Sequence, residues 1–205
     1  MSEAMTKGLL IVVSGPAGSG KGTVLKELLR DDSYRYSVSA TTRAPREGEV
    51  AGVSYHYLTR EEFEKRLQAG EMLEYTEYCG NYYGTPKKEA EAVLASGRNL
   101  LLEIEVEGAA NVKKAYPEAV LIMLLPPSFA VQEARLRGRG TETEEKIRER
   151  LARTREEVPC VVHYDYVIYN HDGRADEAVA DIRAIVRAEQ AMVRRNKNVA
   201  EKYFQ

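Results

Sequence analysis

Runs of consecutive apolar residues alternate along this chain with stretches that have the periodicity of amphipathic helices. Residues 9–13 and 120–125 are continuous apolar runs, residues 100–106 form a mostly apolar run, and residues 166–169 form a weaker one. A strand that is apolar on both faces is typical of a parallel sheet with helices on both sides. The alternation therefore predicts an α/β fold in which a parallel sheet is flanked by helices.

Local signals mark several ends of the predicted helices. A helix is expected from residue 21 to residue 30, shortly after the first strand. Thr85 and the proline after it suit a cap and a first helical turn, and Thr141 with Glu144 has the spacing of a capping box. The last helix is predicted over residues 176–194, with its apolar residues along one face.

Residues 36–83 interrupt this alternation. Their predicted strands are short, polar and aromatic, and the helix between them begins at a capping box formed by Thr59 and Glu62. We expect a small mixed α/β insertion on the parallel core. A second, shorter excursion surrounds residues 138–140, where two glycines flank an arginine.

Composition and charge narrow the possible functions. With 30 Lys and Arg residues against 32 Asp and Glu residues, the 205-residue chain has a formal net charge of −2, which argues against a dedicated nucleic-acid binder. No apolar run approaches the ~20 residues that span a bilayer, and the short polar N-terminus does not resemble a signal peptide, so no membrane partner is expected. The two distant cysteines, Cys79 and Cys160, support neither a disulfide framework nor a zinc site, and we expect a reducing, cytoplasmic location.

The stretch from Gly15 to Lys21 matches G-x-x-x-x-G-K, directly after the first apolar run and before a predicted helix. In this motif, loop N–H groups and a helix N-terminus converge on phosphate oxygens, and the lysine reaches the terminal phosphates. The alternative is a glycine-rich turn that binds nothing. The motif favours a fold of the P-loop NTPase type. The predicted ATP-binding residues are Gly15, Pro16, Ala17, Gly18, Ser19, Gly20, Lys21, Gly22 and Thr23.

The loop departs from the usual motif at the position that normally ligates magnesium. Gly22 stands where a serine or threonine is expected, and Thr23 follows it. A Mg²⁺ ion bound with ATP would then be held mainly by nucleotide oxygens, water and a carboxylate from elsewhere. Glu103 and Glu105 are the candidates, since they lie two apart at the end of an apolar run and are expected on one face. The alternative is a solvated strand end.

A second anion site is indicated by Arg43 and Arg46, which lie three apart on a loop bounded by proline and glycine. Such a pair suits bidentate binding of a phosphate monoester, although paired surface arginines are also often simply solvated. Tyr55 and Tyr83 could add phenolic donors.

Four separated motifs carry a family resemblance. They are S-x-T-T-R-x-P-R-x-G-E at 39–49, then G-x-x-Y at 52–55, G-N-Y-Y-G at 80–84 and R-G-R-G-T-E-T-E-E at 137–145. In order and spacing, from about residue 7 to residue 194, the chain resembles bacterial guanylate kinase. The resemblance implies transfer of the terminal phosphoryl group of ATP to GMP, giving ADP and GDP, with magnesium. It also implies the following division: a core of residues 7–35, 86–127 and 158–205, a GMP-binding insertion at 36–85, and a lid region at 128–157.

The resemblance also implies roles for individual residues. It places the GMP phosphate on Ser39, Arg43, Arg46, Tyr55 and Tyr83, and the guanine on Glu74 and Thr85 with Glu105 nearby. It places the phosphates in transfer beside Lys21, Arg43, Arg135, Arg139 and Arg150. It places the adenine near Asn170. Guanine presents N1–H and N2–H₂ donors side by side, which one carboxylate can accept, whereas adenine has an unprotonated N1. Glu74 is therefore the residue expected to select the base. Here Glu103 and Glu105 stand where the family has aspartates.

Two other functions stay open at the level of sequence. One is a non-catalytic module that resembles guanylate kinase and binds phosphorylated partners through Arg43 and Arg46. Such modules typically lack the phosphate loop that this chain keeps. The other is a related kinase with a different phosphorylated acceptor. The sequence leaves the oligomeric state open.

Overall fold

The computed structural model describes residues 7–138, 140 and 142–204. The strands of these residues are β1 (Leu10–Ser14), β2 (Tyr34–Tyr36), β3 (Ala40–Thr41), β4 (His56–Tyr57), β5 (Met72–Tyr78), β6 (Asn81–Pro86), β7 (Asn99–Glu103), β8 (Val120–Leu125) and β9 (Tyr166–Tyr169). The helices are α1 (Lys21–Leu28), α2 (Arg60–Gln68), α3 (Lys87–Ala95), α4 (Val106–Ala115), α5 (Phe129–Gly138), α6 (Glu144–Glu157), α7 (Ala175–Ala191) and α8 (Val199–Tyr203), with 3₁₀ helices η1 (Val158–His163) and η2 (Val193–Arg195).

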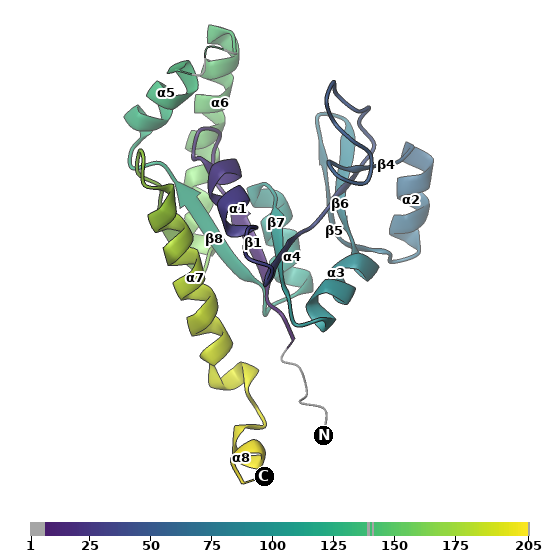
Figure 1. The fold of residues 1–205 in the computed structure, drawn as a ribbon. Helices are drawn as coiled ribbons and strands as arrows, with labels where there is room; N and C mark the ends of the chain where they lie inside the picture. The colour runs from purple at the N-terminus through teal and green to yellow at the C-terminus, as the bar shows by residue number, and fades with distance from the viewer. Residues whose placement is uncertain (1–6, 139, 141, 205) are drawn as a thin grey trace.

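The main sheet of the described chain has five strands in the order β2-β7-β1-β8-β9, and every neighbouring pair is parallel. β1 lies at its centre, where all five of its residues are buried. In such a sheet the carboxyl ends of all strands reach one edge, and ligands bind there. The predicted parallel sheet flanked by helices is confirmed (Figure 1).

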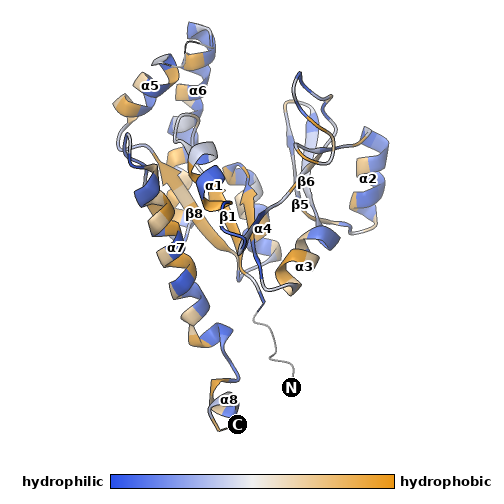
Figure 2. Cartoon of the chain, viewed as in Figure 1, coloured by the Kyte–Doolittle hydropathy of each residue, from blue (hydrophilic) through white to orange (hydrophobic). Residues whose placement is uncertain are grey.

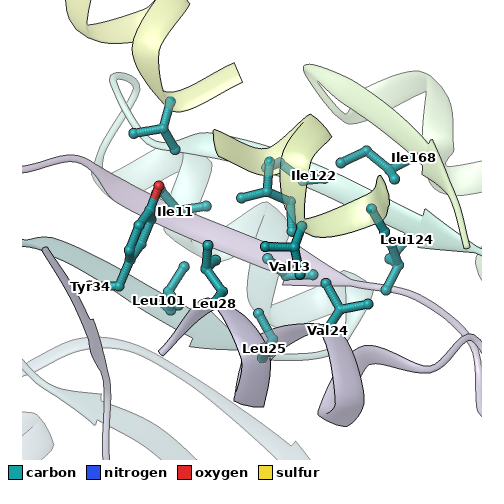
Figure 3. Close-up of a cluster of buried hydrophobic side chains, with 14 of the residues drawn as sticks. Ile11, Val13, Val24, Leu25, Leu28, Tyr34, Leu101, Ile122, Leu124 and Ile168 are labelled. Atoms are coloured by element: carbon teal, nitrogen blue, oxygen red, sulfur yellow. The ribbon is translucent and has the colours of Figure 1, made fainter. Parts of the chain in front are cut away.

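One face of this sheet is covered by α1 and α7. Ile11 and Val13 of β1 pack in one buried cluster with Val24 of α1 and Ile182 of α7. Figure 3 shows how the side chains of Ile11, Val13 and Val24 meet in this layer. α7 ends at Ala191, which is three residues before the predicted end.

The other face of the sheet is covered by α3 and α4. Leu10 and Val12 of β1 pack here with Leu94 of α3 and Val112 of α4. Because successive side chains of a strand point to opposite faces, one continuous apolar run supplies both clusters. Burial on both faces holds β1 in place, and the phosphate loop that follows it therefore starts from a rigid strand.

The insertion forms a second sheet, with the strand order β4-β3-β6-β5 among the described residues. β5 and β6 are antiparallel, and α2 packs on this sheet through the fully buried Phe63. The predicted capping box is confirmed: the Thr59 side chain accepts from the backbone of Glu62, and the Glu62 side chain accepts from the backbone of Thr59.

Two predicted helix starts are wrong. Thr85 lies in β6, and α3 begins at Lys87 after Pro86, without a side-chain cap. α6 is capped by Thr143, whose hydroxyl accepts from the backbone N–H of Lys146; the predicted capping residue Thr141 lies outside the described residues. In the first case the threonine hydroxyl bonds Glu74 on the neighbouring strand β5 instead of capping the helix.

Helices α5 and α6 and the second sheet flank the phosphate-loop edge of the main sheet. In Figure 1, α5 and α6 stand on one side of the start of α1, and the second sheet with α2 stands on the other. Apolar residues concentrate in β1 and β8, whereas α2 and α6 carry many hydrophilic residues (Figure 2). None of the described helices combines the length and the apolar character that a membrane crossing requires.

Candidate active site

The loop between β1 and α1 has the backbone conformation that phosphate binding requires. Gly20 has a φ of 88°, a left-handed conformation that favours glycine, and a Cβ there would lie 2.2 Å from Nδ2 of Asn170. Lys21 begins α1, and its Nζ donates to the carbonyl oxygen of Gly15, so the side chain folds back over the loop. A helix N-terminus and a lysine ammonium therefore share one loop, and this chemistry suits an anion.

Two cavities lie beside this loop. One, of about 580 Å³, is lined by the loop together with Lys26, Glu103 and Arg150. The other, of about 630 Å³, is lined by the loop together with Arg135 and residues 170–173. Folding thus brings the predicted ATP-binding loop together with predicted site residues from three distant parts of the chain.

Asn170 and Arg135 connect the second cavity to the phosphate loop. The buried amide of Asn170 donates from Nδ2 to the carbonyl oxygen of Ser19 at 2.8 Å, and within the described structure its Oδ1 has no hydrogen-bond partner. Arg135 donates to the carbonyl oxygens of Gly18 and Asn170 and pairs with Asp172 at 2.7 Å. Arg135 therefore braces the cavity wall, and Oδ1 of Asn170 is a fixed acceptor.

The other arginines of the region 128–157, Arg137 among them although it was not a predicted site residue, differ in their surroundings. Arg150 of α6 lines the first cavity and pairs with Glu142 at 2.6 Å. Arg137 pairs with Glu133 and Glu144, and so links α5 to α6. Arg139 was predicted to be catalytic and lies outside the described residues.

The predicted phosphate clamp lies on the second sheet and on the loop after β3. The Arg43 guanidinium carbon lies 5.4 Å from the centroid of the Tyr55 ring, whose centroid lies 6.1 Å from that of Tyr83. Ser39 is half-buried just before β3, and Arg46 is exposed on the loop. The structure therefore brings Arg43, Tyr55 and Tyr83 together, with a cation and two phenols at one place.

Glu74 is a buried carboxyl opposite Thr85. It is 7% exposed, and the Thr85 hydroxyl donates to its Oε1 at 2.8 Å across the β5–β6 pair. Burial raises the pKa of Glu74 to about 7, against the opposing effect of the hydrogen bonds from Thr85. Its other oxygen, Oε2, would lie 3.5 Å from a Cβ added to Gly108 of α4. The carboxyl thus lies between the second sheet and α4.

Comparison with known proteins identifies the family to which the chain is similar. The guanylate kinase family model matches residues 7–189. A guanylate kinase from Halalkalibacterium halodurans is 50% identical over 97% of this chain and 96% of its own, and one from Clostridium tetani is 46% identical over 95% and 92%. The crystal structure of guanylate kinase from Anaplasma phagocytophilum superposes with a TM-score of 0.73, at 34% identity over 93% of this chain and 90% of that one.

The chain belongs to the guanylate kinase family. It is an ATP:GMP phosphotransferase, and its reaction is the ATP-dependent phosphorylation of GMP to GDP. The predicted fold and activity are therefore confirmed, and the two alternatives from the sequence, a non-catalytic binding module and a kinase for another acceptor, are set aside.

In this guanylate kinase, Glu103 and Glu105 do not share a strand face as predicted. β7 ends at Glu103, and Glu105 is the N-cap residue of α4. Glu105 pairs with Arg153 of α6 at 2.5 Å, and the Arg153 guanidinium carbon lies 4.6 Å from the centroid of the Tyr78 ring. The strand prediction failed because the apolar run continues into a helix, which periodicity over so few residues does not reveal.

Arg153 is a further residue beside the predicted site, and no sequence motif pointed to it. It connects helix α6 to Glu105 at the start of α4 and to Tyr78 at the end of β5. It lies three residues after Arg150, and residues three apart share a helix face. That spacing was the available signal. Its partners, however, are 48 and 75 residues away in the chain, so the contact follows only from the tertiary structure.

The residues around the phosphate loop are compatible with a nucleotide-bound Mg²⁺ ion. Among the described residues, no group of three or more His, Cys, Asp or Glu side chains could hold a metal by itself. Glu103 nevertheless lines the cavity beside the phosphate loop, where one carboxylate faces the space next to Lys21 and Thr23. Mg²⁺ is commonly held by one or two carboxylates together with substrate phosphates and water, and this donor set fits that pattern.

Proposed function

We propose that this guanylate kinase holds the phosphates of ATP on residues 15–23 and GMP on the insertion at 36–85, while the lid region at 128–157 closes over both and the remaining residues form the core. The observation that supports this arrangement most is the buried pair of Glu74 and Thr85 between the second sheet and α4. A buried carboxyl away from the phosphate loop is expensive unless a ligand uses it.

Glu74 selects guanine in this proposal. Its carboxylate accepts from N1–H and N2–H₂ of the base, while the Thr85 hydroxyl holds the carboxylate in place. Adenine offers no N–H at N1, so binding AMP would leave a buried carboxylate unpaired, and sites of this kind reject mismatched ligands by ~10⁴ or more. Glu105 lies nearby at the start of α4 and is shared with Arg153.

The GMP phosphate is held by Arg43 and Arg46 with Ser39, Tyr55 and Tyr83. It is already an anion, so it attacks the terminal phosphoryl group of ATP without a protein general base. Phosphoryl transfer leaves the protein mainly positioning and charge stabilisation.

Positive side chains supply that charge in the proposed mechanism. Lys21 and Arg150 line the cavity beside the phosphate loop, and they stabilise the negative charge that develops on the transferred group. Arg135 and Arg139 complete the set when the lid closes, and closure excludes water, which would otherwise hydrolyse ATP. Asn170 lines the cavity beside Gly18 and Gly20, where the adenine binds in this proposal.

We propose Mg²⁺ as the cofactor, bound with ATP. Glu103 is the residue that would hold it, through a water molecule, because Gly22 has no hydroxyl to offer. When bound, the ion neutralises phosphate charge. We place the enzyme in the cytoplasm, and the two free cysteines Cys79 and Cys160 are compatible with that compartment.

A coupled assay of ADP formation tests these roles. The wild-type chain receives ATP with GMP, AMP, CMP or UMP in turn, and turnover is expected with GMP. In Glu74→Gln, the KM for GMP should rise far more than the KM for ATP. Equal effects on the two constants would remove Glu74 from base recognition. Turnover on AMP with none on GMP would overturn the guanine assignment as a whole.

A further inference from the structure

Glu49 occupies the centre of a hydrogen-bond network in the loop that carries the phosphate clamp. Its Oε1 accepts from NH2 of Arg43 at 2.9 Å, and its Oε2 accepts from NH1 of Arg43 at 3.0 Å. Oε2 also accepts from the backbone N–H of Arg46 at 2.7 Å and from the Tyr57 hydroxyl at 2.8 Å. One carboxylate therefore receives four hydrogen bonds from three residues, of which Arg43 and Arg46 belong to the proposed phosphate clamp.

The donors of Arg43 show what this network leaves available. A guanidinium carries five N–H groups in one plane. Glu49 takes one from NH1 and one from NH2, and the carbonyl oxygen of Ala44 takes another from NH1 at 2.7 Å. The N–H groups that Glu49 and Ala44 do not use, on Nε and NH2, lie side by side along one edge, and the Tyr83 hydroxyl, itself part of the proposed clamp, also hydrogen-bonds this guanidinium. An edge of two parallel donors is the part of an arginine that binds a phosphate bidentately.

The ring of Tyr55 gives the Arg43 guanidinium a second contact, in addition to the hydrogen bonds to Glu49. The guanidinium carbon lies over the ring, 5.4 Å from its centroid, which is within the range of a cation–π contact. The side chains of Arg43 and Glu49 are only 15% and 21% exposed. The hydrogen bond from Arg43, then those from Arg46 and Tyr57, lower the pKa of Glu49 to about 2, so the carboxylate stays ionised at neutral pH.

We propose that Glu49 is a positioning residue of the GMP site, which turns the Arg43 guanidinium so that its Nε–NH2 edge faces the phosphate of GMP. This inference rests on the proposed role of Arg43 as part of the phosphate clamp. Two effects on GMP binding compete at Glu49, charge repulsion and the orientation of Arg43. Its negative charge repels the phosphate, but the partly buried Arg43 pair shields that charge, and a fixed fork loses less side-chain entropy on binding. The geometry therefore makes orientation the larger effect.

Calorimetric titration with GMP and with guanosine tests the proposal, because the two ligands differ only in the phosphate. In Glu49→Gln, the Kd for GMP should rise by about 10- to 100-fold, the range expected for loss of a charge-assisted pair of hydrogen bonds, while the Kd for guanosine stays unchanged. Glu47→Gln is the matched control. It removes the same charge from an exposed residue of the same loop, and it should leave both constants near their wild-type values.

Two results would overturn the proposal. Equal weakening of GMP and guanosine would show that Glu49 only maintains the fold of the loop, and tighter binding of GMP would show that charge repulsion outweighs orientation. If Glu49→Gln does not fold, Glu49→Asp serves instead, since it keeps the charge and withdraws the carboxylate by one methylene. It should cause the same selective loss for GMP.

Variants of Arg43 separate this inference from the proposed function on which it depends. Arg43→Met should itself weaken GMP and not guanosine, and adding Glu49→Gln to it should cause no further loss, because the two residues act as a unit. If Arg43→Met leaves GMP binding unchanged, the clamp is wrong. If Arg43→Met weakens GMP binding and Glu49→Gln does not, the clamp stands and the positioning role of Glu49 is wrong.

Discussion

The buried carboxyl of Glu74 should make the free enzyme less stable at high pH than it would be without that charge. Burial raises the pKa of this group from 4.5 to about 7 in the folded state. Between these two pH values the folded protein therefore binds a proton that the unfolded chain has lost. The stabilising contribution of the protonated group is complete below pH 4.5 and is lost as the pH rises to about 7.

The size of the effect follows from the two pKa values. They differ by about 2.5, which corresponds to about 3 kcal/mol of unfolding free energy above pH 7. Glu74→Gln keeps an oxygen that accepts from Thr85 and carries no charge. We therefore expect the variant to match the wild type near pH 4.5 and to be more stable by about 3 kcal/mol at pH 8, or about 6–12 °C in Tm for a chain of this size.

Urea denaturation of both proteins, followed by circular dichroism at pH 4.5 and pH 8 without ligand, measures this difference. Subtracting one protein from the other cancels the titration of all other groups. Guanine binds the ionised carboxylate in the proposed mode, so GMP binding at pH 6 should also release close to one proton more in the wild type than in the variant, because protons lost by the GMP phosphate are common to both. Calorimetry in two buffers with different ionisation enthalpies reports that release.

A stability difference that does not change between pH 4.5 and pH 8 would refute this reasoning about Glu74. A variant that is more stable at pH 8 and still binds GMP as tightly as the wild type would separate the two parts. Such a result would confirm that the Glu74 carboxylate is buried with its charge, and it would exclude Glu74 from recognition of the base. The expected outcome, higher stability together with weaker GMP binding, is the usual trade-off at a site that keeps a charge buried for its ligand.

Four further predictions concern the phosphate loop, the α6 contact and the metal. Lys21→Ala should lower kcat by ~10² or more in steady-state assays, and near-normal turnover would mean that the loop has been misread. Gly20→Ala should lower the Tm and weaken ATP binding, because its Cβ would collide with Asn170, whereas nothing lies within 4 Å of a Cβ at Gly22, so Gly22→Ala should keep its Tm. Arg153→Met should raise the KM for GMP about fivefold without changing the KM for ATP. Arg148→Met, which changes an exposed residue of the same helix, should leave both KM values unchanged. An unchanged KM for GMP in Arg153→Met would make the contact purely structural. Chelation of divalent cations should stop turnover yet leave GMP binding measurable by calorimetry, and full activity without them would contradict the proposed Mg²⁺.

The sequence was informative wherever the site is built from neighbouring residues. A phosphate loop uses consecutive backbone N–H groups and the first turn of one helix, so Gly15 to Lys21 could be recognised as a motif. The same holds for Thr59 and Glu62, which cap a helix through contacts three residues apart. Local signals misled where a residue on a neighbouring strand competed for the same group. Thr85 has the sequence context of a helix cap, but it is a strand residue whose hydroxyl bonds Glu74.

By itself, the sequence determined the parallel sheet, the phosphate loop and the family motifs, because each depends on spacing within short segments. Only the tertiary structure decided that Glu105 lies at the start of α4 and pairs with Arg153, that Arg135 contacts Asn170 and Asp172, and that Glu49 pairs with Arg43. In each of these pairs the charged side chain is long, and the sequence contains several oppositely charged or polar residues with which it could pair. The packing of whole elements on the two faces of β1 decides which partner is close enough to bind.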